Sequence, residues 1–217
     1  MEAFVDLWNF VSQSYPELLG LLWQHLELVG LGTVSATFLG VALGILITRP
    51  RFRWLGQPVM AICNIGQTVP SLAVVAIMLP LIGIGFLPGF FAIFIYILLP
   101  ITRNTRVGIE GVEPALIEAA RGMGMSGRQI LIRLELPLAS YIILAGIRTS
   151  MVIAVGVATL ATFIGAGGLG DMIDRGISLV DTTYLLAGAI PAALLAIAIE
   201  LGMGRLERVI TPKGLRI

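Results

Sequence analysis

The stretch Glu113–Pro137, EPALIEAARGMGMSGRQILIRLELP, is the longest charged and polar interval in an otherwise apolar chain. Pro114 suits the first position of a helix, where its missing N–H has no helical partner to lose. The residues that follow are mostly good helix formers, and Gly122 and Gly124 then interrupt the run. The stretch therefore predicts a short helix that ends at these two glycines.

A second helix is predicted to start directly after them. Ser126-Gly127-Arg128-Gln129 has the spacing of a capping box, in which the Ser126 hydroxyl accepts from the Gln129 backbone and the Gln129 side chain reaches back. We expect this helix to end before Pro137, because a proline disfavours the helical conformation in the residue preceding it. The interval is thus expected to be a kinked pair of helices.

The end of the first helix has a nearly bare surface at Glu118, Ala119 and Ala120, which another protein could approach closely. A solvated loop between two membrane spans is the plainer alternative. The spacing from Glu118-Ala119-Ala120 to Gly124, Leu134 and Pro137 resembles the EAA loop of bacterial ABC importer permeases, with Leu134 where isoleucine is usual. The resemblance implies that this loop docks on a separate ATPase subunit. The coupling residues that it implies are Glu118, Ala119, Ala120, Gly122, Gly124, Leu134 and Pro137.

The composition is that of an integral membrane protein. Of 217 residues, 57% are apolar and 12% are charged, and the mean hydropathy of +0.97 lies far outside the range of soluble domains. The single cysteine, Cys63, excludes a disulfide framework and is expected to be a small buried hydrophobic residue. The acidic N-terminus lacks the basic region of a cleavable signal peptide, and nothing in the sequence suggests binding to nucleic acid.

Five stretches are apolar and long enough to be expected as all-α membrane spans, since a span needs about 20 residues. They lie at about 26–47, 58–81, 84–104, 141–164 and 184–203. The segment before them, residues 1–24, is amphipathic and carries a second capping-box pattern at Ser14-Tyr15-Pro16-Glu17. We expect a helix to begin at Tyr15 and to lie at the membrane interface, anchored by Trp8 and Trp23.

The basic residues predict the orientation, because Lys and Arg gather on the cytoplasmic side of a membrane. With five spans, every one of the 14 basic residues except Arg175 falls on or near one side. The N-terminus is therefore predicted outside and the C-terminus in the cytoplasm, together with the loop 113–137.

A polar run with glycine and proline interrupts the second predicted span. Irregular backbone at that depth is tolerated where it is buried in protein or lines a cavity, so this run is the candidate translocation path, with a simple proline kink as the alternative. The neutral side chains suit passage of a polar solute. The candidate path residues are Asn64, Gln67, Thr68, Pro70 and Ser71.

A glycine-rich run follows the fourth predicted span. It satisfies the GxGxxG pattern, but a dinucleotide site needs a preceding strand, which is not expected here. We interpret the run as a flexible outer connection and, with its acidic neighbours, as the contact for an external partner. The residues are Gly165, Gly167, Gly168, Gly170 and Asp171.

Few charges lie within the predicted spans, and intramembrane ionisable groups are functional candidates by default. Arg148 is expected either to pair with Glu135 or to hold the loop against the spans. His25 is expected to be an interfacial residue, and Glu200 to lie near a span end. The lack of an acidic residue at mid-membrane argues against coupling to protons or sodium.

The chain contains no G-x-x-x-x-G-K-[ST] sequence, so it is not expected to bind ATP in that way. Five further segments resemble permeases of the osmoprotectant ABC importers, which carry glycine betaine, carnitine and choline. They are Gln67–Leu72, Pro100–Thr105, Ala145–Ser150, the glycine-rich run into Asp171, and Thr211–Leu215.

This narrower resemblance implies the five-span type I importer fold, also called MetI-like, in the bacterial plasma membrane. It implies a permease domain at 25–208 and a cytoplasmic tail at 209–217. It also implies transport by alternating access, with the energy supplied by separate ATPase subunits. The partners it implies are a cytoplasmic ATPase dimer that holds ATP and magnesium, a second permease subunit, an external substrate-binding protein and the lipid bilayer. No cofactor is expected on this chain.

Other functions compete with this interpretation. The same machine could carry methionine or another amino acid, because the EAA loop is indifferent to substrate. An ion-coupled secondary carrier is disfavoured by the missing mid-membrane acid. An intramembrane enzyme would need clustered His, Asp or Cys within the spans, and a membrane scaffold would leave the polar break in the second span unexplained.

Overall fold

The computed structural model describes residues 2–210, and all its regular elements over that range are helices. Four helical stretches are long and apolar enough to cross a membrane, and a fifth crossing is counted if a bent pair of helices is one span. The helices are α1 (Glu2–Thr48), α2 (Gly56–Thr68), α3 (Ser71–Ile82), α4 (Phe86–Glu110), α5 (Pro114–Gly122), α6 (Gly127–Ile130), α7 (Leu136–Ala161), α8 (Gly170–Leu179) and α9 (Thr182–Ile210).

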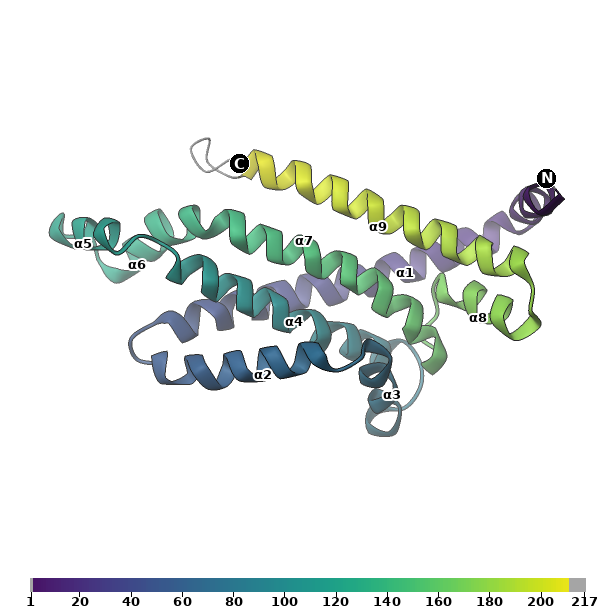
Figure 1. The fold of residues 1–217 in the computed structure, drawn as a ribbon, viewed down its shortest axis with the longest axis horizontal. Helices are drawn as coiled ribbons and strands as arrows, with labels where there is room; N and C mark the ends of the chain where they lie inside the picture. The colour runs from purple at the N-terminus through teal and green to yellow at the C-terminus, as the bar shows by residue number, and fades with distance from the viewer. Residues whose placement is uncertain (1, 211–217) are drawn as a thin grey trace.

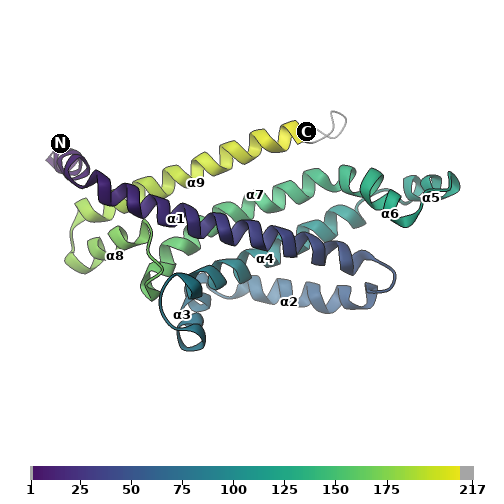
Figure 2. The same cartoon turned by 180° about the vertical axis from the view of Figure 1, so that it is seen from behind.

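Helices α1, α4 and α7 form the centre of the bundle (Figures 1 and 2). Glycines let their backbones approach closely. A Cβ atom on Gly44 of α1 would lie 2.5 Å from Cβ of Thr105 on α4, and one on Gly146 of α7 would lie 2.5 Å from Cβ of Asn104. Small residues at helix contacts are typical of membrane bundles, where close packing replaces the hydrophobic effect between helices. Two buried clusters, a larger one and a smaller one, lie between these three helices, and α3 adds Val75 and Met78 to the larger one.

The second predicted span is broken, as its polar run predicted. Helices α2 and α3 are bent by 101° relative to each other, and Val69 between them has an extended backbone. Pro70 is the N-cap of α3 and cannot donate a helical hydrogen bond. The chain therefore turns sharply at the junction, and α3 leaves the direction of the other long helices (Figure 1).

Helix α5 and the turn after it follow the sequence prediction, whereas the second helix does not end before Pro137. Helix α6 continues through a π-helical segment, η2 (Leu131–Glu135), directly into α7. Within η2 the hydrogen-bonded residues are one position further apart in the sequence than in an α-helix, and the Leu136 N–H donates to the carbonyl of Leu131. The prediction was wrong because this wider turn places Pro137 in the first turn of α7, where its missing N–H has no helical partner to lose.

The N-terminal part of the chain also differs from the prediction. Helix α1 runs unbroken from Glu2 to Thr48 with Pro16 inside it, so no helix begins at Tyr15. Upstream apolar residues Phe10 and Val11 pack with Leu18 and Leu21 against α8 and α9, and this packing favours helix on both sides of the proline. At 1.5 Å per residue, α1 is about 70 Å long, more than twice the hydrocarbon thickness of a bilayer.

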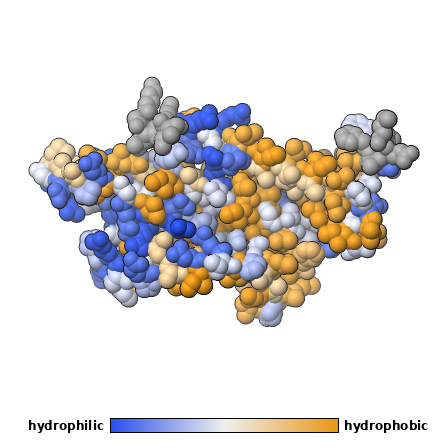
Figure 3. Space-filling model, in the orientation of Figure 1, coloured by the Kyte–Doolittle hydropathy of each residue, from blue (hydrophilic) through white to orange (hydrophobic). Residues whose placement is uncertain are grey.

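The two ends of the bundle differ in character. Helices α5 and α6 lie at one end, here called the α5 end, and α8 lies at the other, the α8 end (Figure 1). On the face in Figure 3, hydrophilic surface gathers toward the α5 end and hydrophobic surface covers much of the rest. Helix α9 returns along the outside of the bundle, and only 17% of its most apolar 18-residue stretch is buried.

Candidate functional site

The loop 113–137 is built around a tight end to α5. Gly124 has φ +80°, a left-handed conformation that glycine adopts without strain. The Met125 N–H donates to the Ala120 carbonyl at 3.1 Å and the Gly124 N–H to that of Arg121 at 2.9 Å, which is a Schellman motif. This motif fixes the direction in which the chain leaves α5.

The predicted capping box then starts α6. The Ser126 N–H donates to Oε1 of Gln129 at 2.8 Å, and the Gln129 N–H donates to the Ser126 hydroxyl at 3.4 Å. Of the residues assigned to coupling, Ala120 is buried and Leu134 half-buried, while the others are exposed. The exposed group is Glu118, Ala119, Gly122, Gly124 and Pro137. The α5 end thus presents a small-residue surface that a partner could contact.

A cavity of about 790 Å³ separates α5 from the end of α1. Glu118 and Arg121 of α5 line it on one side, and Arg49 lines it with Glu135 on the other. Four arginines and three glutamates line it in all: Arg49, Arg53, Arg106, Arg121, Glu110, Glu118 and Glu135.

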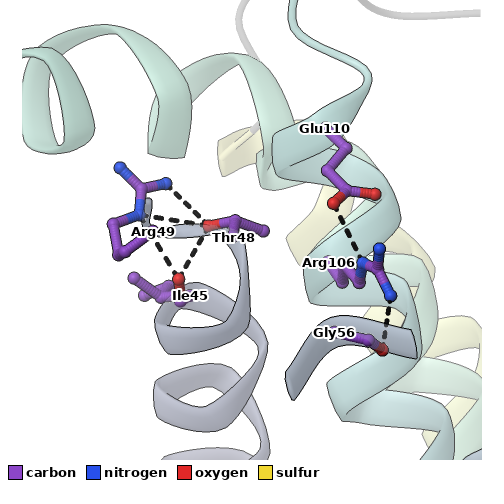
Figure 4. A network of polar contacts seen from close by, with 6 residues as sticks. All are labelled: Ile45, Thr48, Arg49, Gly56, Arg106 and Glu110. Atoms are coloured by element: carbon purple, nitrogen blue, oxygen red, sulfur yellow. Dashed lines mark hydrogen bonds and ion pairs between the residues drawn. The ribbon is translucent and has the colours of Figure 1, made fainter. Parts of the chain in front are cut away.

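Arg49 and Arg106 hold the ends of helices around this cavity (Figure 4). The Arg49 side chain folds back on α1, where its Nη2 donates to the Thr48 hydroxyl at 2.8 Å. The Arg106 Nη1 donates to the Gly56 carbonyl at 2.7 Å, and its Nε donates to Oε1 of Glu110 at 2.9 Å. Arg106 therefore joins α4 to the start of α2.

The path candidates lie at the bend between α2 and α3. Asn64, Thr68 and Pro70 are exposed, whereas Gln67 and Ser71 are half-buried. The Thr68 hydroxyl donates to its own helix, at the Ile65 carbonyl, 2.7 Å away. The amide nitrogen of Gln67 is buried and has no hydrogen-bond partner within residues 2–210. The bend thus carries polar groups that the described fold leaves available.

The glycine-rich run at the α8 end turns the chain from α7 into α8. Gly165, Gly167 and Gly168 have φ values of +75°, +78° and +96°, and Gly170 begins α8 with Asp171 in its first turn. The Thr162 hydroxyl donates to the Asp171 carboxylate. The Thr162–Asp171 hydrogen bond joins the end of α7 to the first turn of α8.

Helix α1 supplies the other side of this contact. The Gly168 N–H donates to Oε1 of Gln24 at 3.2 Å, and a Cβ on Gly168 would lie 3.0 Å from Nδ1 of His25. His25 is fully buried, not interfacial as predicted. The Val155 backbone lies near its ring, but neither ring nitrogen makes an aligned hydrogen bond within the described residues.

Beyond the run, Arg175 of α8 donates to Oε1 of Glu17 at 2.7 Å. This hydrogen bond raises the pKa of the Arg175 guanidinium, which therefore stays charged at any physiological pH. The ion pair joins α8 to the N-terminal part of α1, next to the contact between the rings of Phe10 and Tyr184, whose centroids are 4.6 Å apart.

Arg148 pairs with two glutamates of α9 and not with Glu135, so that alternative is wrong. Its Nε donates to Oε1 of Glu200 at 2.9 Å, and its Nη1 donates to Oε2 of Glu207 at 3.0 Å. Glu135 instead lies with its Oε2 2.7 Å from Nη2 of Arg49. The Arg148 triad carries one net negative charge and ties α7 to the loosely packed α9.

Comparison with known proteins shows the family to which the chain belongs. Residues 40–213 match the family described as binding-protein-dependent transport system inner membrane component. The chain belongs to this family. It is therefore an ABC transporter permease, a membrane component and not an enzyme. A permease of this type implies a partner ATPase and a substrate-binding protein.

Three relatives match the permease along nearly its whole length. The carnitine transport permease protein OpuCB of Listeria monocytogenes is 44% identical over 100% of this chain and 97% of its own. The glycine betaine/carnitine/choline transport system permease protein OpuCD of Bacillus subtilis is 43% identical over 98% and 92%. The osmoprotectant import permease protein OsmW of Salmonella typhimurium is 42% identical over 98% and 100%.

Solved structures show the same fold. An inward-facing crystal form of the MetNI methionine ABC transporter matches the permease with a TM-score of 0.81 over 90% of this chain and 96% of that chain, at 23% identity. An amino acid ABC transporter with histidines matches with a TM-score of 0.67 over 91% and 94%, at 18% identity. The MetI-like fold that the resemblance to osmoprotectant permeases implies is thereby confirmed.

Two features of the site were missed by the sequence reasoning. The partners of Arg148 could have been found, because Glu200 and Glu207 are seven residues apart and so lie on one face of a helix. The burial of His25 had no comparable signal, because the glycine run that covers it is more than 140 residues away.

Proposed function

We propose that this permease is the membrane-spanning subunit of an ATP-driven importer of quaternary-ammonium osmoprotectants, with glycine betaine, carnitine and choline as substrates. The observation that carries the proposal is the 42–44% identity, over nearly the full chain, to three permeases named for these solutes or for osmoprotectant import. Two permease subunits, two cytoplasmic ATPase subunits that hold ATP and magnesium, and an external binding protein would form the complete importer.

The loop 113–137 is proposed as the contact with the ATPase. Its support is the exposed surface of α5 around Glu118 and Ala119, next to a chain direction fixed by Gly124. The N-terminus lies outside and the C-terminus lies in the cytoplasm in this proposal, as the distribution of basic residues predicts. The last residues, 211–217, lie outside the described part of the chain.

The solute path is proposed at the bend between α2 and α3. Its support is the group of neutral polar side chains at a 101° break in an otherwise apolar span, because such breaks are tolerated where they line a cavity. The glycine run at Gly165–Gly170, with Asp171, is proposed as the contact for the binding protein at the opposite end of the bundle from α5 (Figure 1).

The substrate assignment is tested by uptake in proteoliposomes that hold the permease with its ATPase and binding protein. Radiolabelled glycine betaine should accumulate inside the vesicles only when ATP is enclosed in the lumen with the ATPase. Excess choline or carnitine should compete with it for uptake. Competition by methionine alone would assign the amino-acid alternative. Uptake that continues without ATP and stops when an ion gradient is dissipated would refute the ATP-driven mechanism.

The coupling assignment is tested by Gly124→Val, with Gly127→Ala as its matched control. Both glycines have open space around them, but only Gly124 has a positive φ, where a side chain costs about 1–2 kcal/mol. We expect Gly124→Val to abolish uptake while the protein still inserts in the membrane, and Gly127→Ala to transport normally. Normal uptake by Gly124→Val would remove the assigned role of this loop.

A further inference from the structure

The π-helical segment η2 is the point at which the coupling loop joins the membrane bundle. It follows α6 without a break and leads into α7. The hydrogen bonds of a π-helical turn span one residue more than those of an α-helix, and such turns are frequent at functional sites and are places where helices kink. Pro137 follows the segment directly, in the first turn of α7. An unsupported helix would bend here when the loop is pushed.

An ion pair between half-buried Arg49 and buried Glu135 supports this segment from the side. Glu135, the last residue of η2, is buried, and its Oε2 lies 2.7 Å from Nη2 of Arg49 at the end of α1. The two atoms are in close ionic contact, although their approach is not aligned for a hydrogen bond. Removing Arg49 would leave the buried Glu135 carboxylate without its cation, which is costly.

The Arg49 guanidinium is itself held in position by α1. Its Nε lies 3.3 Å from the Ile45 carbonyl that it donates to, and its Nη2 donates to Thr48 (Figure 4). Glu135 therefore meets a cation already fixed to the last turn of α1. A fork-shaped guanidinium can make these contacts and the ion pair at once, which a lysine could not.

Leu136 packs in a cluster with Ile109 of α4 and Ile45 of α1, and the ion pair adds a charged connection to these apolar contacts. Among the ion pairs within residues 2–210, only Arg49–Glu135 joins the interval 113–137 to another element. Helix α5 lies across the 790 Å³ cavity from the end of α1. This ion pair is thus the charged contact that would transmit a displacement of the loop to α1.

We propose that Arg49 and Glu135 are positioning residues for energy coupling. Their ion pair braces η2 against α1, so that a displacement of α5 and α6 moves α7 and α1 together and is not absorbed by bending at the π-helical segment. The inference rests on the proposed function. It predicts that loss of the pair lowers the number of solute molecules carried per ATP hydrolysed, while ATP hydrolysis itself continues.

The test compares uptake and ATP hydrolysis in the same proteoliposomes, prepared with the permease, its ATPase and its binding protein and supplied with radiolabelled glycine betaine. Glu135→Gln keeps the size of the side chain and removes its charge, so it is the variant least prone to misfold. We expect its uptake per ATP to fall about fivefold or more, the lower end of typical coupling between two sites. Arg49→Glu should lower the ratio further, and the exchange of both charges in Arg49→Glu, Glu135→Arg should restore much of it.

Glu110→Gln is the matched control, because it also neutralises one glutamate. Glu110 lines the same cavity, but its partner Arg106 lies on the same helix, so this variant should leave the ratio unchanged. An unchanged ratio in Glu135→Gln would overturn the proposal, as would a parallel loss of uptake and hydrolysis in Glu135→Gln. If the wild-type complex carries no glycine betaine, the proposed substrate fails first, and the pair is then judged with whichever solute stimulates ATP hydrolysis.

Discussion

The close contact between α1 and α4 makes a sharp prediction for Gly44→Ala. A Cβ at this position would lie 2.5 Å from Cβ and 2.7 Å from Cγ2 of Thr105, and 2.9 Å from the Thr102 carbonyl oxygen. The side chain of a buried threonine has little room to move, and the carbonyl belongs to the backbone of α4. The two helices must therefore separate to admit one methyl group.

Gly30→Ala, on the same helix, isolates the size of this effect. No atom lies within 4 Å of a Cβ at Gly30. Both substitutions gain roughly 1 kcal/mol of helix propensity, and this gain cancels when the two variants are compared. The remaining difference is the overpacking at Gly44, about 1–3 kcal/mol for an inserted methyl group in a packed core.

The assay is thermal unfolding of both variants in the same detergent, followed by tryptophan fluorescence. At about 2–4 °C per kcal/mol for a chain of this size, Gly44→Ala should melt roughly 2–12 °C below Gly30→Ala. Gly30→Ala should melt at or slightly above the wild type. Equal melting temperatures for the two variants would show that α1 and α4 do not meet through their backbones, and would refute the packing argument.

Three further substitutions test other parts of the molecule. Arg148→Leu leaves the buried carboxylate of Glu207 without its cation. Because Arg148 itself is half-buried, the loss of stability in detergent unfolding should lie at the low end for a broken buried pair, about 3 kcal/mol, and neutralising both glutamates as well should recover most of it. Gly168→Val places a side chain at φ +96° beside the buried histidine, so uptake should fall severalfold while assembly with the ATPase persists; normal uptake would contradict the tight fit of this run. Gln67→Leu removes a buried amide nitrogen without a partner in the described chain, so stability should stay or rise by about 1 kcal/mol while glycine betaine uptake falls, and unchanged uptake would exclude it from the path.

The two capping-box patterns show what the sequence can and cannot predict about helix ends. At Ser126 the pattern was correct, because Gly124 at positive φ has already broken the preceding helix. At Ser14 the same pattern was wrong, because apolar residues before it pack on α8 and α9 and extend the helix through Pro16. A capping box therefore predicts a helix start only where another residue has ended the preceding helix.

The broken span was predictable for a related reason. Asn64, Gln67 and Pro70 fall in one short run, and a polar run with a proline is costly in an unbroken membrane helix. By contrast, the partners of Arg148 and Arg49 lie 52 to 86 residues away in the sequence, so only the packing of α1, α7 and α9 could bring them together. Local chemistry thus indicates where helices stop, whereas long-range contacts decide which charges meet.

The inner contacts divide the molecule into parts that can and cannot move past each other. Helices α1, α4 and α7 touch through glycines at distances that leave no space for sliding, so a conformational change that keeps these contacts must turn the three as one body. The bent pair α2 and α3 and the loosely packed α9 surround this body, and the loop 113–137 stands at its end. Each of these three is tied to the body by one arginine: Arg106 to the start of α2, Arg148 to α9 and Arg49 to the end of η2. Charged contacts thus join the three-helix body to each of the elements around it, and the helices inside the body meet at backbone distance.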